Sequence, residues 1–295
     1  MLPSLSTMPI DPGVAILAPQ ATSDDGLVAL WLGTYTRSPH THAAYQSDAA
    51  AFRAFVGKPL RTVRLGDVQA FAASIQHQAP ASIARRLSAV KSLFKLGLRL
   101  GYLTFDVAAP VQLPAIEDTL AERILTEWDV QQLLGRESRP RNTALLRLLY
   151  GAGLRISEAA ALQWRHLTPR DDAGQVSIFG KGGKTRIVLL PRALYERVHA
   201  LRGNAPDDGP VFRSRHGGPL SRVQVHRIVK SAAKRAGLKP NISAHYLRHA
   251  HCSHALDRGA PVHVVQQTLG HASLTTTTRY SHARPGDSSA RYLAT

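Results

Sequence analysis

The sequence predicts a mainly α protein of two domains, with one β-hairpin in the second. At 295 residues the chain is long for a single domain. Apolar residues recur with the helical period of 3.6 in several segments, most clearly from Ser82 to Arg99. Two short β-branched runs, Val176 to Phe179 and Arg186 to Leu190, indicate strands of a hairpin.

The chain is strongly basic. It has 37 Lys and Arg against 20 Asp and Glu, a formal charge of +17, and 44% hydrophobic residues that can form a sizeable core. A protein with such an excess of positive charge usually binds a polyanion, most often nucleic acid. The alternative explanation of the charge is a proteome that is basic in general. Cys252 is the only cysteine, which favours a reducing cytoplasm. No apolar run reaches the roughly 18 residues of a membrane span, so we expect no membrane association.

The first domain is expected over residues 24–110, after a disordered leader over residues 1–23. Four prolines interrupt any helix in that leader. No Lys or Arg precedes Arg37, which argues against a signal peptide.

The segment from Ser82 to Arg99 predicts an amphipathic helix. Its apolar stripe contains Ile83, Leu87, Val90, Phe94 and Leu98. The opposite face is basic and polar, as expected for a helix laid along a phosphate backbone. A solvated charged face is the alternative. The candidate DNA-binding residues on this face are Arg85, Ser88, Ser92, Lys95 and Arg99.

A linker is expected over residues 111–123, followed by the second domain over residues 124–282 and a tail over residues 283–295. Thr126 to Asp129 has the pattern of a helix capping box. Further helices are predicted from Thr143 to Tyr150 and from Val223 onward. The expected helix stops are Gly151, Gly153, Gly237 and Gly259.

The predicted hairpin has a basic, glycine-rich tip from Gly180 to Lys184. The end of this segment resembles a nucleotide-binding loop, but that motif needs a glycine at the position of Ile178. It also needs a helix after Lys184, where the sequence predicts a strand. ATP binding is therefore rejected, and a lysine at this tip can instead reach into a DNA groove.

Near the C-terminus, His245 and Arg248 are three residues apart and so share one helix face. An arginine there can hold two phosphate oxygens, and a histidine can exchange a proton. Ser243 is placed to cap this helix. Upstream, Arg155 follows a glycine turn and can join Arg248 on the phosphate. Glu158, one turn later, can orient a guanidinium group or the histidine.

The histidines around His245 also permit a metal-site interpretation. His245 and His249 have the i, i+4 spacing of a ligand pair. No glutamate completes a zinc motif, and there is no second cysteine. His249 and His254 also suit a helix interior in which polar contacts satisfy them. We therefore expect no metal and no other cofactor.

Tyr280 follows a polar stretch of four threonines and an arginine. Because nothing apolar flanks it closely, the sequence predicts an exposed tyrosine, which suits a nucleophile. Serine, cysteine and carboxylate alternatives lack an equally placed base and phosphate clamp.

Together these residues resemble the tyrosine recombinase (phage integrase) family. The phrase from His245 to Ala250 and the phrase from Val264 to Tyr280 look like its Xer-like bacterial members. The resemblance is strong over residues 125–282 and general over residues 24–110. The residues that carry it are Arg155, Lys181, His245, Arg248, His271 and Tyr280.

The resemblance implies a role for each of these residues. Tyr280 would attack the scissile phosphate and leave a 3′-phosphotyrosyl link. Arg155 and Arg248 would stabilise charge on the phosphate, and His271 would hydrogen-bond to it. His245 would act as acid or base, and Lys181 as general acid, with Lys184 as the alternative. Glu158 matches the family's supporting carboxylate.

The family fold has a helical N-terminal core-binding domain and a mainly α catalytic domain with a small antiparallel β-sheet. These domains close as a C-shaped clamp on DNA. The implied function is site-specific recombination of double-stranded DNA in the cytoplasm, on the nucleoid. The implied assembly is a homotetramer, or a heterotetramer with a second recombinase. The tail could dock on a neighbouring subunit.

Two other functions are alternatives to recombination. A type IB topoisomerase-like enzyme would relax DNA by the same phosphotyrosine chemistry without sequence specificity. A DNA-binding regulator would retain the fold without the reaction. The sequence leaves open whether a recombinase of this kind integrates, resolves dimers or inverts DNA.

Overall fold

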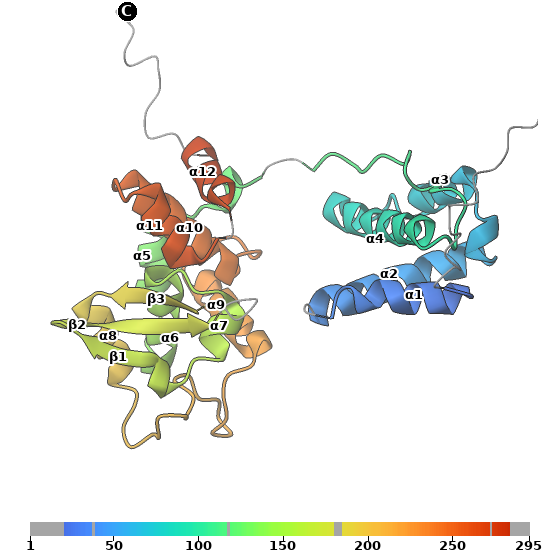
Figure 1. Cartoon of the computed structure of the whole chain (residues 1–295). Coiled ribbons are helices and arrows are strands. Elements are labelled where there is room, and N and C mark those ends of the chain that lie inside the picture. Colours follow the sequence, from blue (N-terminus) through green and yellow to red (C-terminus); the bar gives the residue numbers. More distant parts are fainter. Residues whose placement is uncertain (1–20, 37–38, 117–118, 180–184, 272, 284–295) are drawn as a thin grey trace, which may run out of the picture. The chain divides into compact units, whose positions relative to one another are not determined.

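The computed structural model describes residues 21–36, 39–116, 119–179, 185–271 and 273–283 (Figure 1). Over these residues the chain is mainly helical and contains one three-stranded antiparallel sheet, which confirms the predicted fold class. It divides into two compact units between Glu117 and Asp118. None of the described helices is both long and apolar enough to cross a membrane.

The first unit is a group of helices around an aromatic and aliphatic core. Phe52 meets Phe94 edge to face within it. Ala21 and Ser23 fall within the expected leader, yet Ala21 packs into this core and Ser23 Oγ accepts the Gly26 N–H at 3.0 Å. The remaining leader residues, 1–20, lie outside the described part of the chain. The helices are α1 (Asp24–Gly33), α2 (Pro39–Val56), η1 (Leu60–Thr62), α3 (Leu65–Ser74) and α4 (Pro80–Arg99).

Helix α4 is amphipathic as predicted, with one difference near its C-terminal end. It begins at Pro80, two residues before the expected start at Ser82. Leu98, which the helical period placed on the apolar stripe, is 43% exposed. Gly97 faces the core instead, and a Cβ there would lie 2.7 Å from a Leu103 methyl carbon. The prediction for Leu98 was wrong because the chain folds back over Gly97, which the period alone does not reveal.

The expected linker is partly packed. Val111 is buried in the core of the first unit. Lys91 Nζ donates to the Val111 carbonyl at 2.5 Å. On the other side of the division, a 3₁₀ turn, η2 (Ala121–Arg123), leads into the second unit.

The second unit begins with the predicted capping box. Thr126 Oγ1 accepts the Asp129 N–H at 3.1 Å, and Asp129 Oδ2 accepts the Thr126 N–H at 3.0 Å. Helix α10 runs through the helical part and packs against α5, α6, α11 and α12 (Figure 1). The elements are α5 (Glu127–Gly135), α6 (Pro140–Gly151), α7 (Ile156–Ala160), η3 (Trp164–His166), α8 (Arg192–His199), α9 (Arg222–Arg235), α10 (Ala244–Asp257), α11 (Val262–Leu269) and α12 (Leu274–Ala283).

The sheet confirms the predicted hairpin and adds a strand before it. Its order is β1-β2-β3, with Val176 opposite Val188 and Phe179 opposite Thr185 in the hairpin. Because a strand follows the tip, the structure agrees with the rejection of a nucleotide-binding loop. The tip itself, residues 180–184, lies outside the described residues. The strands are β1 (Leu167–Arg170), β2 (Ala173–Phe179) and β3 (Thr185–Leu190).

Two glycines with positive φ form the turns that precede Arg155 and His271. Gly153, between α6 and α7, has φ of 59°, and a Cβ there would lie 2.5 Å from Leu269. Gly270, which ends α11, has φ of 64°. Both conformations favour glycine, which lacks a Cβ. Gly153 lets the turn before Arg155 approach His251 of α10, and Gly270 lets the turn before His271 approach Arg186 of β3.

Candidate active site

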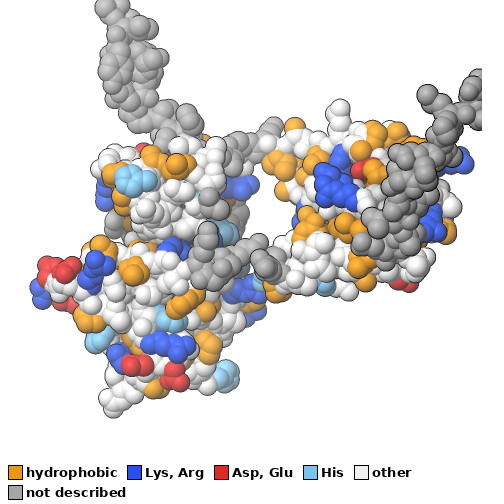
Figure 2. All heavy atoms as spheres, in the orientation of Figure 1, with side chains coloured by type: hydrophobic (Ala, Val, Ile, Leu, Met, Phe, Trp, Pro, Cys, Tyr) orange, Lys and Arg blue, Asp and Glu red, His pale blue; other side chains and the backbone are white. Residues whose placement is uncertain are grey.

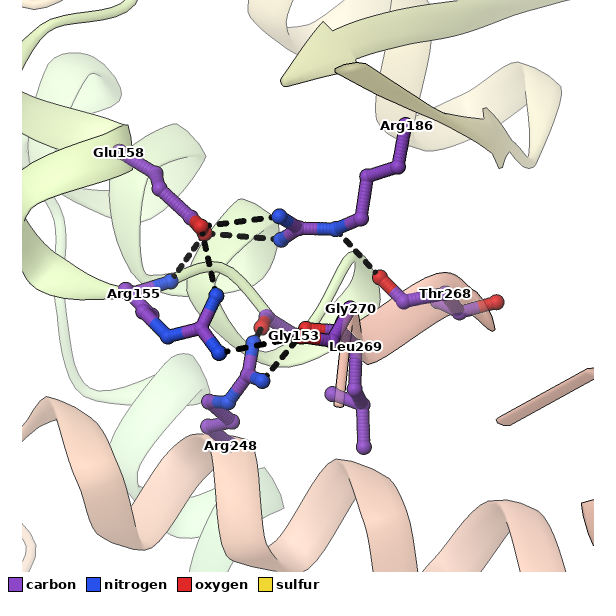
Figure 3. Close-up of polar contacts among 8 residues, drawn as sticks. All are labelled: Gly153, Arg155, Glu158, Arg186, Arg248, Thr268, Leu269 and Gly270. Carbon is purple, nitrogen blue, oxygen red and sulfur yellow. Dashed lines mark hydrogen bonds and ion pairs between the residues drawn. The ribbon is translucent and has the colours of Figure 1, made fainter. Parts of the chain in front are cut away.

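Arg248 lies on the buried face of α10 and is only 5% exposed. Its Nη1 donates to the Gly153 carbonyl at 2.5 Å and its Nη2 to the Leu269 carbonyl at 2.6 Å (Figure 3). These bonds tie α10 to the turn before α7 and to the end of α11. Burial, assisted by the charge of Arg155, lowers the pKa of Arg248 to about 10, so the group remains cationic at neutral pH.

Glu158 joins two arginines on different elements. Arg155, the N-cap residue of α7, donates from its main chain to Oε2 at 2.7 Å and from Nη1 to Oε1 at 2.9 Å. Arg186, on β3, donates to both carboxylate oxygens, at 2.9 and 2.8 Å (Figure 3). Burial alone would raise the pKa of Glu158, but the bonds from Arg186 and Arg155 outweigh it and lower the pKa to about 2. The carboxylate is therefore ionised and fixes both guanidinium groups.

The same arginines also hold the turn between α11 and α12. Arg186 Nε donates to the Thr268 carbonyl at 2.8 Å, and Arg155 Nη2 donates to the Gly270 carbonyl at 3.3 Å (Figure 3). Each terminal guanidinium nitrogen carries two N–H bonds, so these partners do not exhaust the donors of Arg155. We call Arg155, Glu158, Arg186 and Arg248 the arginine side of the site.

The other part of the site consists of uncharged polar groups. Tyr280, on α12, has its hydroxyl 2.5 Å from His249 Nδ1. His271 Nδ1 lies 2.9 Å from the hydroxyl of Thr277. The rings of His271 and Tyr280 are nearly parallel, with centroids 6.4 Å apart. We call His249, His271, Thr277 and Tyr280 the tyrosine side.

Both histidines of the tyrosine side are neutral at neutral pH. Burial, followed by the charges of His245, Arg123 and Arg248, lowers the pKa of His249 to about 4. Burial lowers the pKa of His271 to about 4 as well, and Arg248 is the next largest cause. A neutral imidazole keeps one nitrogen that can accept a proton or a hydrogen bond.

His245 lies one helical turn before His249, with ring centroids 6.3 Å apart. Burial lowers the pKa of His245, and Arg248 and Arg155 lower it further. His245 and His249 line an open recess of about 390 Å³, which Arg123 and Lys239 also line. Glu122 lines the same recess, so the charges around it are mixed.

The structure brings most of the sequence-predicted catalytic residues into this one region. Arg155 and Glu158 come from α7 and its N-cap, His245 and Arg248 from α10, and His271 and Tyr280 from the α11–α12 segment. Lys181 and Lys184 lie outside the described residues. The strand that leaves their tip, β3, places Arg186 on Glu158. Ser243 occupies the N-cap position of α10, but its side chain makes no capping bond.

The expectation that Tyr280 is exposed was wrong. The side chain is 6% exposed and packs with Ile124, Cys252, Val265 and Leu269. Its sequence neighbours are polar, but α12 lies against α10 and α11, which supply the apolar contacts. Burial here depends on residues distant in sequence, so the local pattern did not reveal it.

Two further histidines of α10, His251 and His254, bear on the metal-site interpretation, and both contact other protein groups. His254, which was expected to suit the helix interior, is buried, with Nδ1 2.9 Å from Tyr150 Oη and Nε2 2.9 Å from the Leu125 carbonyl. His251 Nδ1 lies 2.7 Å from the Tyr150 carbonyl. Within the described residues, no group of three His, Cys, Asp or Glu side chains is placed to hold a metal ion.

Three residues of the site were not predicted from the sequence: Arg186, His249 and Thr277. Arg186 carried a usable signal, because it shares the inward register of β3 with Val188 and Leu190, both buried. A charged residue on that face requires a partner inside the protein. His249 gave no comparable signal, since its contact with Tyr280 spans 31 residues.

The candidate DNA-binding residues of α4 differ in their surroundings. Lys95 and Arg99 are exposed. Arg85 pairs with the buried Asp48, and Ser92 Oγ lies 3.1 Å from Trp31 Nε1, so these two have partners within the unit. An open hollow of about 770 Å³ is lined by Ser88, Ser92, Lys95 and Arg99 together with Lys91, Asp106 and apolar residues. Figure 2 shows Lys and Arg side chains more widely than Asp and Glu on the face it displays.

Two family models and several known proteins match this chain. The family model "Phage integrase family" matches residues 123–286, and the model "Phage integrase, N-terminal SAM-like domain" matches residues 31–100. The chain is 33% identical over 264 residues to tyrosine recombinase XerC of Pelobacter propionicus, covering 83% of this chain and 85% of the relative. It is 34% identical over 291 residues to tyrosine recombinase XerD of Pseudomonas aeruginosa, covering 91% and 96%.

A solved structure shares the fold. The XerH site-specific recombinase bound to difH substrate superposes with a TM-score of 0.70 at 20% identity, covering 88% of this chain and 81% of that one. The family match spans more than half of the chain and includes the whole arginine side and tyrosine side. The chain therefore belongs to the phage integrase family, the tyrosine recombinases.

Proposed function

We propose that this protein is a site-specific DNA recombinase that cuts and rejoins strands through Tyr280. The observation that carries the proposal is the placement of the Tyr280 hydroxyl in one site with Arg248 and His271, next to the braced pair of Arg155 and Glu158. Tyr280 Oη would attack the scissile phosphorus, forming a phosphotyrosyl bond while the bond to the 5′-oxygen breaks. The reverse steps rejoin the strands. Because the phosphotyrosyl bond conserves the energy of the broken bond, the reaction needs no ATP.

The arginine side would hold the phosphate. The guanidinium groups of Arg155 and Arg248 would stabilise the charge that develops on its non-bridging oxygens, and loss of one such donor costs roughly 3–4 kcal/mol in the barrier. Glu158 and Arg186 would keep Arg155 in place. His271 would donate a hydrogen bond to the phosphate, and His245 would act as acid or base beside Arg248.

The 5′-oxygen that leaves needs a proton. We assign this role to Lys181, with Lys184 as the alternative, because both belong to the segment that joins β2 to β3. The ion pair of Arg186 with Glu158 fixes the base of β3 at the site. A lysine in the segment that precedes β3 can therefore reach the same phosphate.

The substrate would be double-stranded DNA with a specific recombination site, contacted by both units. The net charge of +17 supports this choice, as do the exposed Lys95 and Arg99 on α4. Residues 24–110 would act as the core-binding domain and residues 124–282 as the catalytic domain. A tetramer, of identical subunits or with a second recombinase, would join two such sites in the cytoplasm, on the nucleoid.

Covalent trapping on fragmented genomic DNA tests the proposal. Wild-type protein should remain attached to DNA after denaturation, whereas Tyr280→Phe, which loses one oxygen and keeps the ring, should form no adduct. Tyr195→Phe on α8 is the matched control and should form adducts like the wild type. Sequencing the attached DNA should show one site.

The same experiment separates the other functions. Adducts scattered over the genome would indicate topoisomerase-like relaxation rather than recombination. Adducts formed equally by Tyr280→Phe would exclude Tyr280 as the nucleophile. If neither protein forms adducts, with host extract present, an inert DNA-binding relative replaces the proposal.

A further inference from the structure

The contact between Tyr280 and His249 has a chemical consequence for the nucleophile. His249 follows His245 by one turn of α10, and its Nδ1 lies 2.5 Å from Tyr280 Oη. The two rings have centroids 5.6 Å apart at an angle of 36°. A hydrogen bond of this length is within reach of direct proton transfer.

The hydroxyl is the donor in this bond. A tyrosine hydroxyl ordinarily has a pKa of about 10 and is protonated at neutral pH. Burial lowers the pKa of His249 to about 4, so its imidazole is neutral. We therefore assign the imidazole proton to Nε2, which leaves Nδ1 as the acceptor.

The groups that shift the pKa of His249 are cationic or neutral, although the acidic Glu122 of η2 lines the same recess. On α10 itself, His245 and Arg248 face His249, and Arg123 faces it from η2. From the α11–α12 segment, His271 and Tyr280 face it. This surrounding favours a neutral histidine.

We propose that His249 is a catalytic residue that takes the hydroxyl proton of Tyr280 during strand cleavage. This inference rests on the proposed function. As the Oη–H bond breaks, the proton moves to Nδ1 and His249 becomes an imidazolium. The Oη–P bond forms and the P–O5′ bond breaks, with the 5′-oxygen protonated by the separate general acid. During rejoining, His249 returns the proton to Oη.

DNA binding would switch this base on. Without DNA, the arginines around His249 disfavour an imidazolium, so the tyrosine stays protonated. A phosphate held by Arg155 and Arg248 brings negative charge to the same place, which favours the charged form of His249. The nucleophile is thereby activated only when its substrate phosphate is present.

The substitution His249→Asn tests the proton transfer apart from positioning. The asparagine side-chain amide can occupy the place of Nδ1 and hydrogen-bond to Oη, but it is not a base. The rate of adduct formation on genomic DNA fragments should fall about 100-fold or more, within the range for loss of a general base. His263→Gln on α11, an exposed histidine, is the matched control and should react at the wild-type rate.

A more acidic phenol should rescue the variant. Trifluorotyrosine placed at position 280 loses its proton without a strong base. In His249→Asn it should recover most of the lost rate, whereas in the wild type it should change the rate little. A merely structural role for His249 gives no such recovery, because the fluorinated ring repairs no packing defect.

Two results would overturn the inference while leaving the proposed function intact. One is a His249→Asn rate equal to that of the control. The other is a slow His249→Asn protein that trifluorotyrosine does not rescue. Absence of adducts with the wild type would instead overturn the proposed function and this inference together.

A measurement on the unsubstituted protein decides the matter if His249→Asn fails to fold. Nitrogen NMR of labelled histidine should show an unprotonated, hydrogen-bonded Nδ1 for His249 at neutral pH, as it should for His254, whose Nε2 donates to the Leu125 carbonyl. The His249 resonance should move in Tyr280→Phe. A protonated Nδ1 at His249 would contradict the proposal.

Discussion

The arginine side of the active site is held by charges and main-chain carbonyls, whereas the tyrosine side is held by neutral rings and hydroxyl groups. On the arginine side, one ionised carboxylate fixes two guanidinium groups, and Arg248 donates to two carbonyls. On the tyrosine side, the contacts join His249 to Tyr280 and His271 to Thr277. The first arrangement is ready to receive an anion, and the second keeps its nucleophile protonated.

The arginine side is thus suited to binding the phosphate, and the tyrosine side controls the reactivity of the nucleophile. Fixed guanidinium groups need little rearrangement when a phosphate arrives, which is the condition for strong electrostatic stabilisation. Neutral imidazoles respond to the phosphate charge by becoming more basic. Substitutions and pH should therefore affect the two sides differently.

The largest effect is expected from Glu158→Gln, which removes the carboxylate shared by Arg155 and Arg186. The Glu158 side chain is 7% exposed, so its loss leaves a buried guanidinium without its counter-charge. We expect the free energy of unfolding to fall by about 3–5 kcal/mol. Chemical denaturation of the DNA-free protein measures this.

The exposed pair of Arg192 and Glu196 provides the control for that measurement. Glu196→Gln should change the free energy of unfolding by less than about 0.5 kcal/mol. Equal effects of the two substitutions would mean that the carboxylate does not brace the arginine side.

Acid should weaken the two sides in separate pH windows. His249, His251 and His271 have folded pKa values of about 4, below the ordinary 6.5, so the unfolded chain binds more protons between these values. Stability is complete above pH 6.5 and falls as the pH drops towards 4. Each such histidine should cost on the order of 1–2 kcal/mol between pH 6.5 and 5.

Glu158 acts in a lower window. Its folded pKa of about 2 lies below the ordinary 4.5, so its contribution persists above pH 4.5 and disappears as the pH falls towards 2. Denaturation at a series of pH values should show the histidine loss in both wild type and Glu158→Gln. A stability that is flat from pH 6.5 to 5 would contradict the neutral tyrosine side.

The smallest effect is expected from Thr277→Val, which removes the hydroxyl beside His271 and keeps the shape. Thr277 is fully buried, so His271 would lose one neutral hydrogen bond at about 1 kcal/mol. Thermal unfolding should show this small loss. Retention of trapping activity within a few-fold would place Thr277 in support of the histidine only, and an abolished reaction would make it part of the chemistry.

Much of the site was predictable because several of its residues lie close together in sequence, where local helix geometry decides their contacts. The spacing of His245 and Arg248 places both on one face of a helix, and the helix is present. Arg155 and Glu158 are joined by their proximity in sequence, three residues apart. Local rules of helix geometry and capping suffice for such contacts.

Other features required contacts between different segments. Tyr280 is buried because α10 and α11 surround it, although its own neighbours are polar. Leu98 is exposed because the chain turns back over Gly97. For Tyr280 the local pattern was outweighed by elements far apart in sequence, and for Leu98 by the turn that follows α4, in which Leu103 packs over Gly97.

By itself the sequence determined the mainly α fold with its hairpin, the family, and the set of chemical groups, since these depend on residue type, period and spacing. Only the tertiary structure decided that Arg186 braces Glu158 and that His249 holds the Tyr280 hydroxyl. Those pairings join β3 to α7 and α10 to α12. Their strength and protonation come from burial, which is a property of the packed elements and of no single segment.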